Sequence, residues 1–188
     1  MKKILFVFIL IAAASCTKKS THTEQVTAYY EGFKNSDYHQ IKRTIADSLT
    51  ILEGDYTMAF TPESFYQQFK WDSVFKPVYE VVTLENEDDH VVAMVSVHSL
   101  RFEFLKNNPL TCQHKFHFTS GKITSIENLD CVDANWEIWQ QERDSLVSWV
   151  KVNHPELDGF IHDLSMKGAI DYLDAIKLYR ERQVEVME

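Results

Sequence analysis

The chain has 188 residues and a formal net charge of −9, with 19 Lys and Arg against 28 Asp and Glu. A chain this acidic does not attract phosphates through its overall field, which excludes nucleic acid as a partner held by bulk charge. Its length suits one compact domain, and its 45% hydrophobic and 13% aromatic residues are enough for a real core.

The first sixteen residues have the pattern of an export signal. Lys2 and Lys3 precede an apolar run at 4–12, and small residues then lead into Cys16. The run is too short for a comfortable membrane span, and the pattern resembles a bacterial lipoprotein signal. We predict a signal peptide over 1–16, a lipid on Cys16 as membrane anchor, and a place in the bacterial cell envelope, at the periplasmic or outer-membrane face. A cleaved secretory signal with an incidental cysteine is the alternative.

The region after the signal begins with a polar tether and two helices. Residues 17–23 suit the tether that a lipid anchor needs. Helical spacing of apolar residues predicts a helix over 24–34, and a second, short helix follows at 38–45. A strand at 47–54 ends at a glycine. A further helix over 61–76 opens with a capping threonine and a proline.

Residues 111–131 are predicted to form one long β-hairpin at the centre of an antiparallel sheet. Two runs of alternating polarity flank a Ser120-Gly121 turn, where glycine can adopt positive φ. Along the first arm, alternate residues form an apolar face that carries one histidine. The residues of this face are Cys112, His114, Phe116 and Phe118.

A strand at 91–105 is predicted to join this hairpin through a short loop. Its even-numbered residues form the more apolar set, so we expect them on the same face as His114. The second arm of the hairpin adds Glu127 to that face. The spacing of His98, His114 and Glu127 matches no recognised metal motif, so we predict neither a metal nor a cofactor. The predicted pocket-lining residues are His98, Phe102, Phe116, Phe118 and Glu127.

Two cysteines remain after the signal, Cys112 and Cys131, at the far ends of the two hairpin arms. They share a face of the predicted hairpin, so an oxidising compartment allows a cross-strand disulfide between them. Two buried free thiols are the alternative interpretation.

Helical spacing resumes after the hairpin. We predict one helix over 134–152, a second that opens at Pro155, and a last one capped by Ser165. Their apolar faces must pack against the sheet or against a second subunit. After the signal and the tether, the chain therefore divides into a domain over 24–132 and a C-terminal helical extension over 133–188.

Two or three helices followed by a long, bent antiparallel sheet resemble the nuclear transport factor 2-like superfamily, also called SnoaL-like. The local signals are the Asn35-Ser36-Asp37 break, Ala46-Asp47 before the first strand, the Phe65 to Phe69 helix, and Gly121-Lys122-Ile123 in the last hairpin. The resemblance covers about residues 24–131. It implies an α+β, cone-shaped domain in which helices and a strongly bent sheet enclose a pocket. Members include ketosteroid isomerases, polyketide cyclases and proteins that only bind, so the fold leaves function open.

Set beside the ketosteroid isomerase branch, the resemblance implies three candidate catalytic residues. Tyr29 falls on the tyrosine that polarises the substrate carbonyl, and Glu53 falls on the catalytic carboxylate. His114 falls near the second oxyanion donor, which is an aspartate in those enzymes. Such an enzyme would use Glu53 to move a proton beside a carbonyl and buried donors to hold the enolate. The alternative interpretation is a core tyrosine, a solvated strand end and a hydrogen-bonded core histidine.

We favour a membrane-anchored, non-catalytic binding domain that holds a small apolar ligand or an envelope protein in its cone. One alternative is an isomerase or cyclase that acts on a carbonyl-containing hydrophobic substrate. Another is a dimeric scaffold, a homodimer whose pocket is filled by its own side chains. An open apolar cone favours ligand binding, an open cone with Glu53 facing donors favours the enzyme, and a closed cone favours the scaffold.

Overall fold

The computed structural model describes residues 21–185, with side chains through residue 182. The predicted signal peptide and Cys16 lie outside the described residues. None of the helices within 21–185 is both long enough and apolar enough to cross a membrane. The elements are α1 (His22–Lys34), α2 (Tyr38–Thr44), β1 (Ile45–Glu53), β2 (Tyr56–Phe60), α3 (Pro62–Ser73), β3 (Val78–Asn86), β4 (His90–His98), α4 (Leu100–Phe104), β5 (Leu110–Thr119), β6 (Lys122–Val132), α5 (Trp136–Asn153), η1 (Pro155–Leu157), η2 (Phe160–His162) and α6 (Met166–Glu185).

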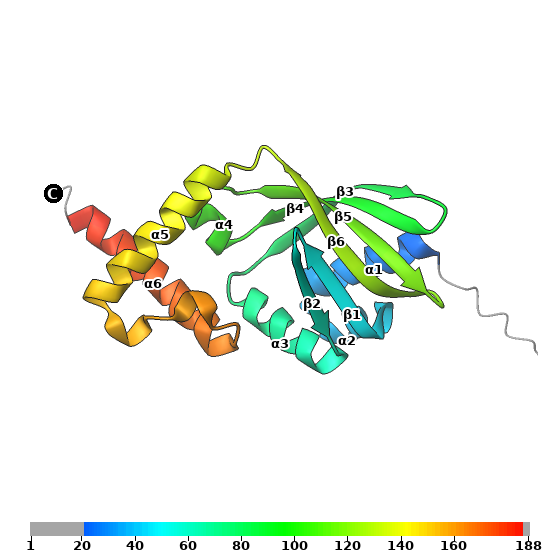
Figure 1. Cartoon of the computed structure of the whole chain (residues 1–188), viewed down its shortest axis with the longest axis horizontal. Helices are drawn as coiled ribbons and strands as arrows, with labels where there is room; N and C mark the ends of the chain where they lie inside the picture. Colours follow the sequence, from blue (N-terminus) through cyan, green and yellow to red (C-terminus); the bar gives the residue numbers. More distant parts are fainter. Residues whose placement is uncertain (1–20, 186–188) are drawn as a thin grey trace, which may run out of the picture.

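One six-stranded sheet forms the body of the fold, in the order β2-β1-β6-β5-β4-β3. The predicted hairpin, now β5 and β6, lies in the middle of this sheet. Strands β1 and β6 run parallel, whereas the other neighbours are antiparallel. The sheet is therefore mixed, and the prediction of a wholly antiparallel sheet is wrong, because alternating polarity carries no information on strand direction. Figure 1 shows the bend of the sheet and the helices α1 and α3 packed along it.

Side-chain caps explain where α1 and α3 begin. The Thr21 hydroxyl accepts a hydrogen bond from the Glu24 backbone N–H, and the Glu24 carboxylate accepts one from the Thr21 N–H. Thr61 and Ser64 form the same reciprocal pair at α3, where Pro62 stands in the first turn. These local signals are why both helices begin within a few residues of their predicted starts.

The first hydrophobic core lies between the sheet and the helices α1 and α3. Helix α1 contributes Val26, Tyr29 and Tyr30, and α3 contributes Phe65 and Phe69. Aromatic rings stack edge to face across this core, an arrangement that adds to the free energy gained from burial. The sheet residues of this core are Ile45, Leu49, Val91, Ala93, Val95, Val97, Phe116, Ile123 and Ile126.

Strand β4 turns toward this core the opposite set of side chains from the predicted one. Val91, Ala93 and Val95 are fully buried, and Ala93 pairs with His114 of β5. The prediction assumed a tight connection between the strands, but the chain inserts α4 there, which shifts the register by an odd number of residues. Since side chains alternate with a period of two, the even-numbered residues move to the other face. His98 is consequently exposed at the end of β4.

A bulge in β6 also changes the face on which Glu127 lies. Ile123 and Ile126 are both buried, although an unbroken strand would turn them to opposite faces. The register between β5 and β6 shifts within this segment, which is the mark of a bulge. Glu127 therefore lies opposite Lys115 on the outer face, and Asn128 takes the inner position.

The helices after the sheet form a second hydrophobic core with α3 and α4. Leu146 of α5 and Ile176 of α6 are fully buried in this core beside Phe75, which follows α3. Figure 1 shows α5 and α6 gathered at one end of the molecule, near α3 and α4. The helix predicted to open at Pro155 is only a pair of 3₁₀ turns, because Gly159, with φ of 91°, interrupts it.

A disulfide joins Cys112 and Cys131, which are direct partners across β5 and β6. A cross-link between residues 19 positions apart restricts the unfolded chain more than the folded one. We predict that replacing both cysteines by serine lowers the free energy of unfolding by about 3 kcal/mol, measured by urea titration. The wild-type midpoint should fall on reduction and that of the variant should not. A wild-type midpoint unchanged by reductant would contradict the bond.

Candidate functional site

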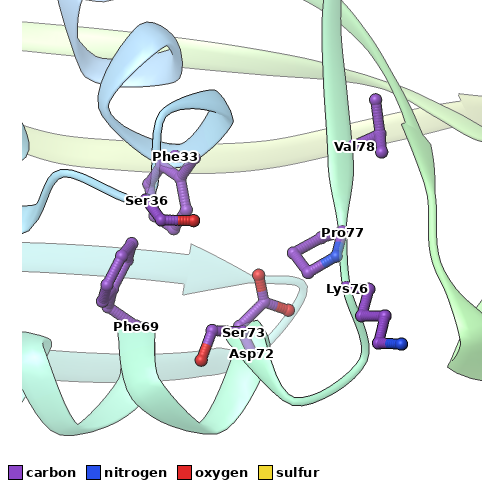
Figure 2. A pocket seen from close by; sticks show the side chains of 8 residues that line it. All are labelled: Phe33, Ser36, Phe69, Asp72, Ser73, Lys76, Pro77 and Val78. Atoms are coloured by element: carbon purple, nitrogen blue, oxygen red, sulfur yellow. The ribbon is translucent and has the colours of Figure 1, made fainter.

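Two cavities meet at the end of α3. The first, called here the cone cavity, has a volume of about 220 Å³. The second, the outer cavity, has about 320 Å³ and lies between the end of α1 and the connection from α3 to β3. Phe33, Phe69 and Asp72 line both cavities. Figure 2 shows the Asp72 carboxylate rising from α3 between Phe69 and Pro77, while the Lys76 side chain points away.

The cone cavity has aromatic and aliphatic walls with a few polar groups among them, as is usual for small-molecule sites. Its lining residues are Tyr29, Phe33, Ile51, Glu53, Met58, Phe60, Phe65, Gln68, Phe69, Asp72, Tyr79 and Asn128. The outer cavity is lined by Phe33, Ser36, Phe69, Asp72, Ser73, Lys76, Pro77 and Val78.

Asp72 and Tyr79 form a hydrogen-bonded pair where the two cavities meet. The Tyr79 hydroxyl donates to Asp72 Oδ2 over 2.6 Å. Burial raises the pKa of the Asp72 carboxyl, and the Tyr79 hydrogen bond and the positive charge of Arg101 lower it in part. Burial also raises the pKa of Tyr79 well above its ordinary value, and the neighbouring Asp72 adds to this. Among residues 21–185, Asp72 Oδ1 has no protein hydrogen bond, so this oxygen can serve a ligand.

Two of the predicted catalytic residues, Tyr29 and Glu53, both line the cone cavity. Tyr29 is buried among aromatic rings, and burial raises the pKa of its hydroxyl. Glu53 is exposed at the end of β1 and pairs in the sheet with Asn128, which lines the same cavity. The cavity thus brings a solvated carboxylate and the pair of Asp72 and Tyr79 into one lining.

His114, the third predicted catalytic residue, lines neither cavity. Its Nδ1 is 2.5 Å from the Tyr30 hydroxyl in the first core. Burial lowers the pKa of this imidazole from 6.5 to about 4, so it is neutral at pH 7. The predicted role of His114 as a donor to the substrate is therefore corrected, because the residue is absent from both cavity linings and its Nδ1 is instead hydrogen-bonded with the Tyr30 hydroxyl of α1.

The predicted pocket-lining residues lie elsewhere in the structure. Phe116 is fully buried in the first core, Phe118 stacks on His22, and Phe102 packs against Trp139. The two polar members are displaced by the register changes in β4 and β6. No group of three or more His, Cys, Asp or Glu in the described part of the chain is arranged to hold a metal ion. The five residues predicted to line the pocket are His98, Phe102, Phe116, Phe118 and Glu127.

Asp72, Tyr79 and Asn128 line the cone cavity but are not among the residues predicted from the sequence. A signal for Asp72 was available, because Phe65, Phe69 and Asp72 follow the i, i+4, i+7 spacing that puts them on one stripe of a helix. An acid on the buried stripe of an amphipathic helix is a candidate site residue. Asn128 reaches the inner face only because of the bulge in β6, which the sequence pattern does not show.

Protonation of His114 should weaken the fold in mildly acidic solution. Its pKa in the folded chain, about 4, lies below the ordinary 6.5, so the unfolded chain binds more protons between these values. The free energy of unfolding should therefore fall between pH 7 and pH 5, by about 2 kcal/mol more in the wild type than in a His114→Gln variant. Urea titrations at several pH values measure this difference. If the free energies of unfolding of the two proteins changed equally with pH, the lowered pKa of His114 would be contradicted.

No family model and no curated protein matches the chain. Solved structures do match it. A protein from Sinorhizobium meliloti described as a polyketide cyclase is 16% identical, with a TM-score of 0.50, and the match covers 56% of this chain and 94% of that one. A protein from Kribbella flavida is 11% identical, with a TM-score of 0.50 and coverage of 65% and 95%. An NTF2-like protein of unknown function from Cytophaga hutchinsonii is 13% identical, with a TM-score of 0.49 and coverage of 60% and 92%.

At these identities the likeness concerns the fold alone. Each solved chain is matched over almost its whole length, whereas this chain has a further part without a counterpart in them. The curved sheet with helices along it and the two matches with a TM-score of 0.50 confirm the predicted fold class: the chain has an α+β fold shared with these solved proteins.

Proposed function

We propose that this domain is a non-catalytic binding protein that holds a small apolar molecule in the cone cavity and is anchored to the cell envelope by a lipid on Cys16. The observation that carries the proposal is the position of Asp72, with its free Oδ1, where two aromatic-walled cavities meet. An apolar wall attracts an apolar body, and one polar group fixes its orientation.

The size and polarity of the site define the ligand. Small-molecule sites usually span about 300 to 1,000 Å³, and the cone cavity is smaller, at about 220 Å³. The ligand is therefore small, or it extends past Asp72 into the outer cavity. Tyr79 already donates to one oxygen of the carboxylate, so the ligand group best suited to the other oxygen is a donor, a hydroxyl or an N–H.

Native mass spectrometry of the chain, extracted from membranes with mild detergent, tests this proposal. We expect an adduct of a few hundred daltons that is lost on denaturation. Asp72→Asn should weaken the affinity for the adduct at least about tenfold, and so lower its occupancy, because a hydrogen bond to a charged acceptor is worth about 1.5–3 kcal/mol. Glu80→Gln, an exposed position on β3, serves as the matched control and should retain the adduct. A bare chain, or a bare dimer, would contradict the proposal and favour a scaffold with a filled pocket or an envelope-protein partner.

A second candidate is an isomerase or cyclase acting on a carbonyl-containing hydrophobic substrate. The observation in its favour is that Glu53 lines the same cavity as Asp72 and Tyr79. Glu53 would move the proton beside the carbonyl, and a protonated Asp72, whose Oδ2 accepts from Tyr79, would donate from Oδ1 to the enolate in place of His114. Burial favours the protonated form of Asp72, which this role requires.

The second candidate makes a separate prediction for Glu53→Gln. Loss of the base should lower turnover of a β,γ-unsaturated ketone about 10²- to 10⁴-fold. The melting temperature should hardly change, because Glu53 is exposed. Absorbance of the conjugated product measures turnover. A wild-type chain that turns over no such ketone would rule out this candidate and leave the binding proposal standing.

A further inference from the structure

An open groove separates the sheet domain from the C-terminal helices. Its volume is about 560 Å³, within the range of small-molecule sites. It shares no lining residue with the cone cavity or the outer cavity. The groove is lined by Trp71, Arg101, Leu105, Trp139, Arg143, Asp144, Val147, Ile161, His162, Leu164 and Tyr172.

Arg101 on α4 is an unpaired cation in this groove. Its guanidinium carbon lies 4.9 Å from the ring centroids of both Trp71 and Phe102, and 6.0 Å from that of Trp139. Within residues 21–185 the guanidinium has no ion pair and donates no hydrogen bond to the protein. Its planar fork of N–H donors matches a carboxylate in shape and charge. Arg101 therefore faces the groove without an ion pair, although its charge also acts on the nearby Asp72 carboxyl.

The remaining charges of the groove do not cancel that of Arg101. Arg143 forms an ion pair with Asp144 over 2.8 Å, so these two groups neutralise each other. Burial raises the pKa of Tyr172, and the positive charges of Arg101 and Arg143 lower it in part. Among the charged side chains that line the groove, Arg101 is therefore the cation without an ion pair within residues 21–185.

We propose that this groove binds a small monocarboxylate with an aromatic body. The carboxylate accepts two parallel hydrogen bonds from Arg101, and the aromatic body packs against Trp139, Val147 and Tyr172. The shape of the site favours this ligand because the rings stacked on Arg101 hold the guanidinium in place before a ligand arrives, which lowers the entropy lost on binding.

Isothermal titration calorimetry of the purified chain with naphthalene-2-carboxylate and with 2-naphthamide tests the proposal. The two probes have nearly the same shape, and only the first carries a charge. The wild type should bind the carboxylate at least about tenfold more tightly than the amide, and Arg101→Gln should remove this preference. Arg180→Gln is the matched control: Arg180 also lies over an aromatic ring, but outside the groove and paired with Glu103. It should keep the preference.

Arg101 also covers aromatic rings, so Arg101→Lys serves as a second variant if the glutamine variant does not fold. Lysine keeps the positive charge but lacks the planar fork of N–H donors, so this variant should retain only part of the preference for the carboxylate over the amide. Equal wild-type affinity for carboxylate and amide would overturn the proposal without any variant. Loss of carboxylate binding in Asp72→Asn, with full retention in Arg101→Gln, would also overturn it, because the probe would then lie in the cone cavity.

Discussion

Helix α3 is the constraint on which the rest of the structure depends, because two hydrophobic cores bury it on two sides. Phe65 and Phe69 pack in the first core, while Trp71 and Phe75, at and just after its last turn, pack in the second. The indole N–H of Trp71 also donates to the Asp163 backbone carbonyl over 3.2 Å, which ties α3 to the turn before α6. Helix α3 therefore belongs to both hydrophobic cores and joins the sheet domain to the C-terminal helices.

The candidate sites follow from that position. Asp72 lies between Phe69, which packs in the first core, and Phe75, which packs in the second. Its carboxyl is therefore largely buried, and burial raises its pKa. Tyr79 donates to Oδ2, so Oδ1 remains for a ligand. Trp71, its neighbour in the chain, lines the groove instead. Arg101 stacks on Trp71 and also acts on the charge of Asp72. The two candidate ligand sites thus lie on either side of one peptide unit, with Arg101 near both.

A second tie holds the C-terminal helices in place. Asn107, buried before β5, accepts a hydrogen bond from the Asn135 N–H over 2.7 Å and donates one to the Asn135 carbonyl over 3.1 Å. Asn135 is itself the cap of α5. The connection that follows α4 therefore sets where α5 begins. The α4 segment lies within the strand predicted over 91–105, and it both shifts the register of β4 and contributes Arg101 to the groove.

The sequence by itself determined the features that depend on local chemistry: the capped helices α1 and α3, the hairpin around Ser120-Gly121, and the apolar face of β5. Tyr29 and Glu53, which came from the resemblance to the ketosteroid isomerase branch, line one cavity. Only the tertiary structure decided which face of β4 and of the end of β6 turns inward. An inserted helix and a bulge move alternate side chains to the other face of the sheet, but they leave the alternation of polar and apolar residues in the sequence unchanged. The tertiary structure likewise decided that His114 lies against Tyr30 in the core and that Asp72 lies in the lining of both cavities, since burial of a polar group depends on neighbours that are distant in sequence.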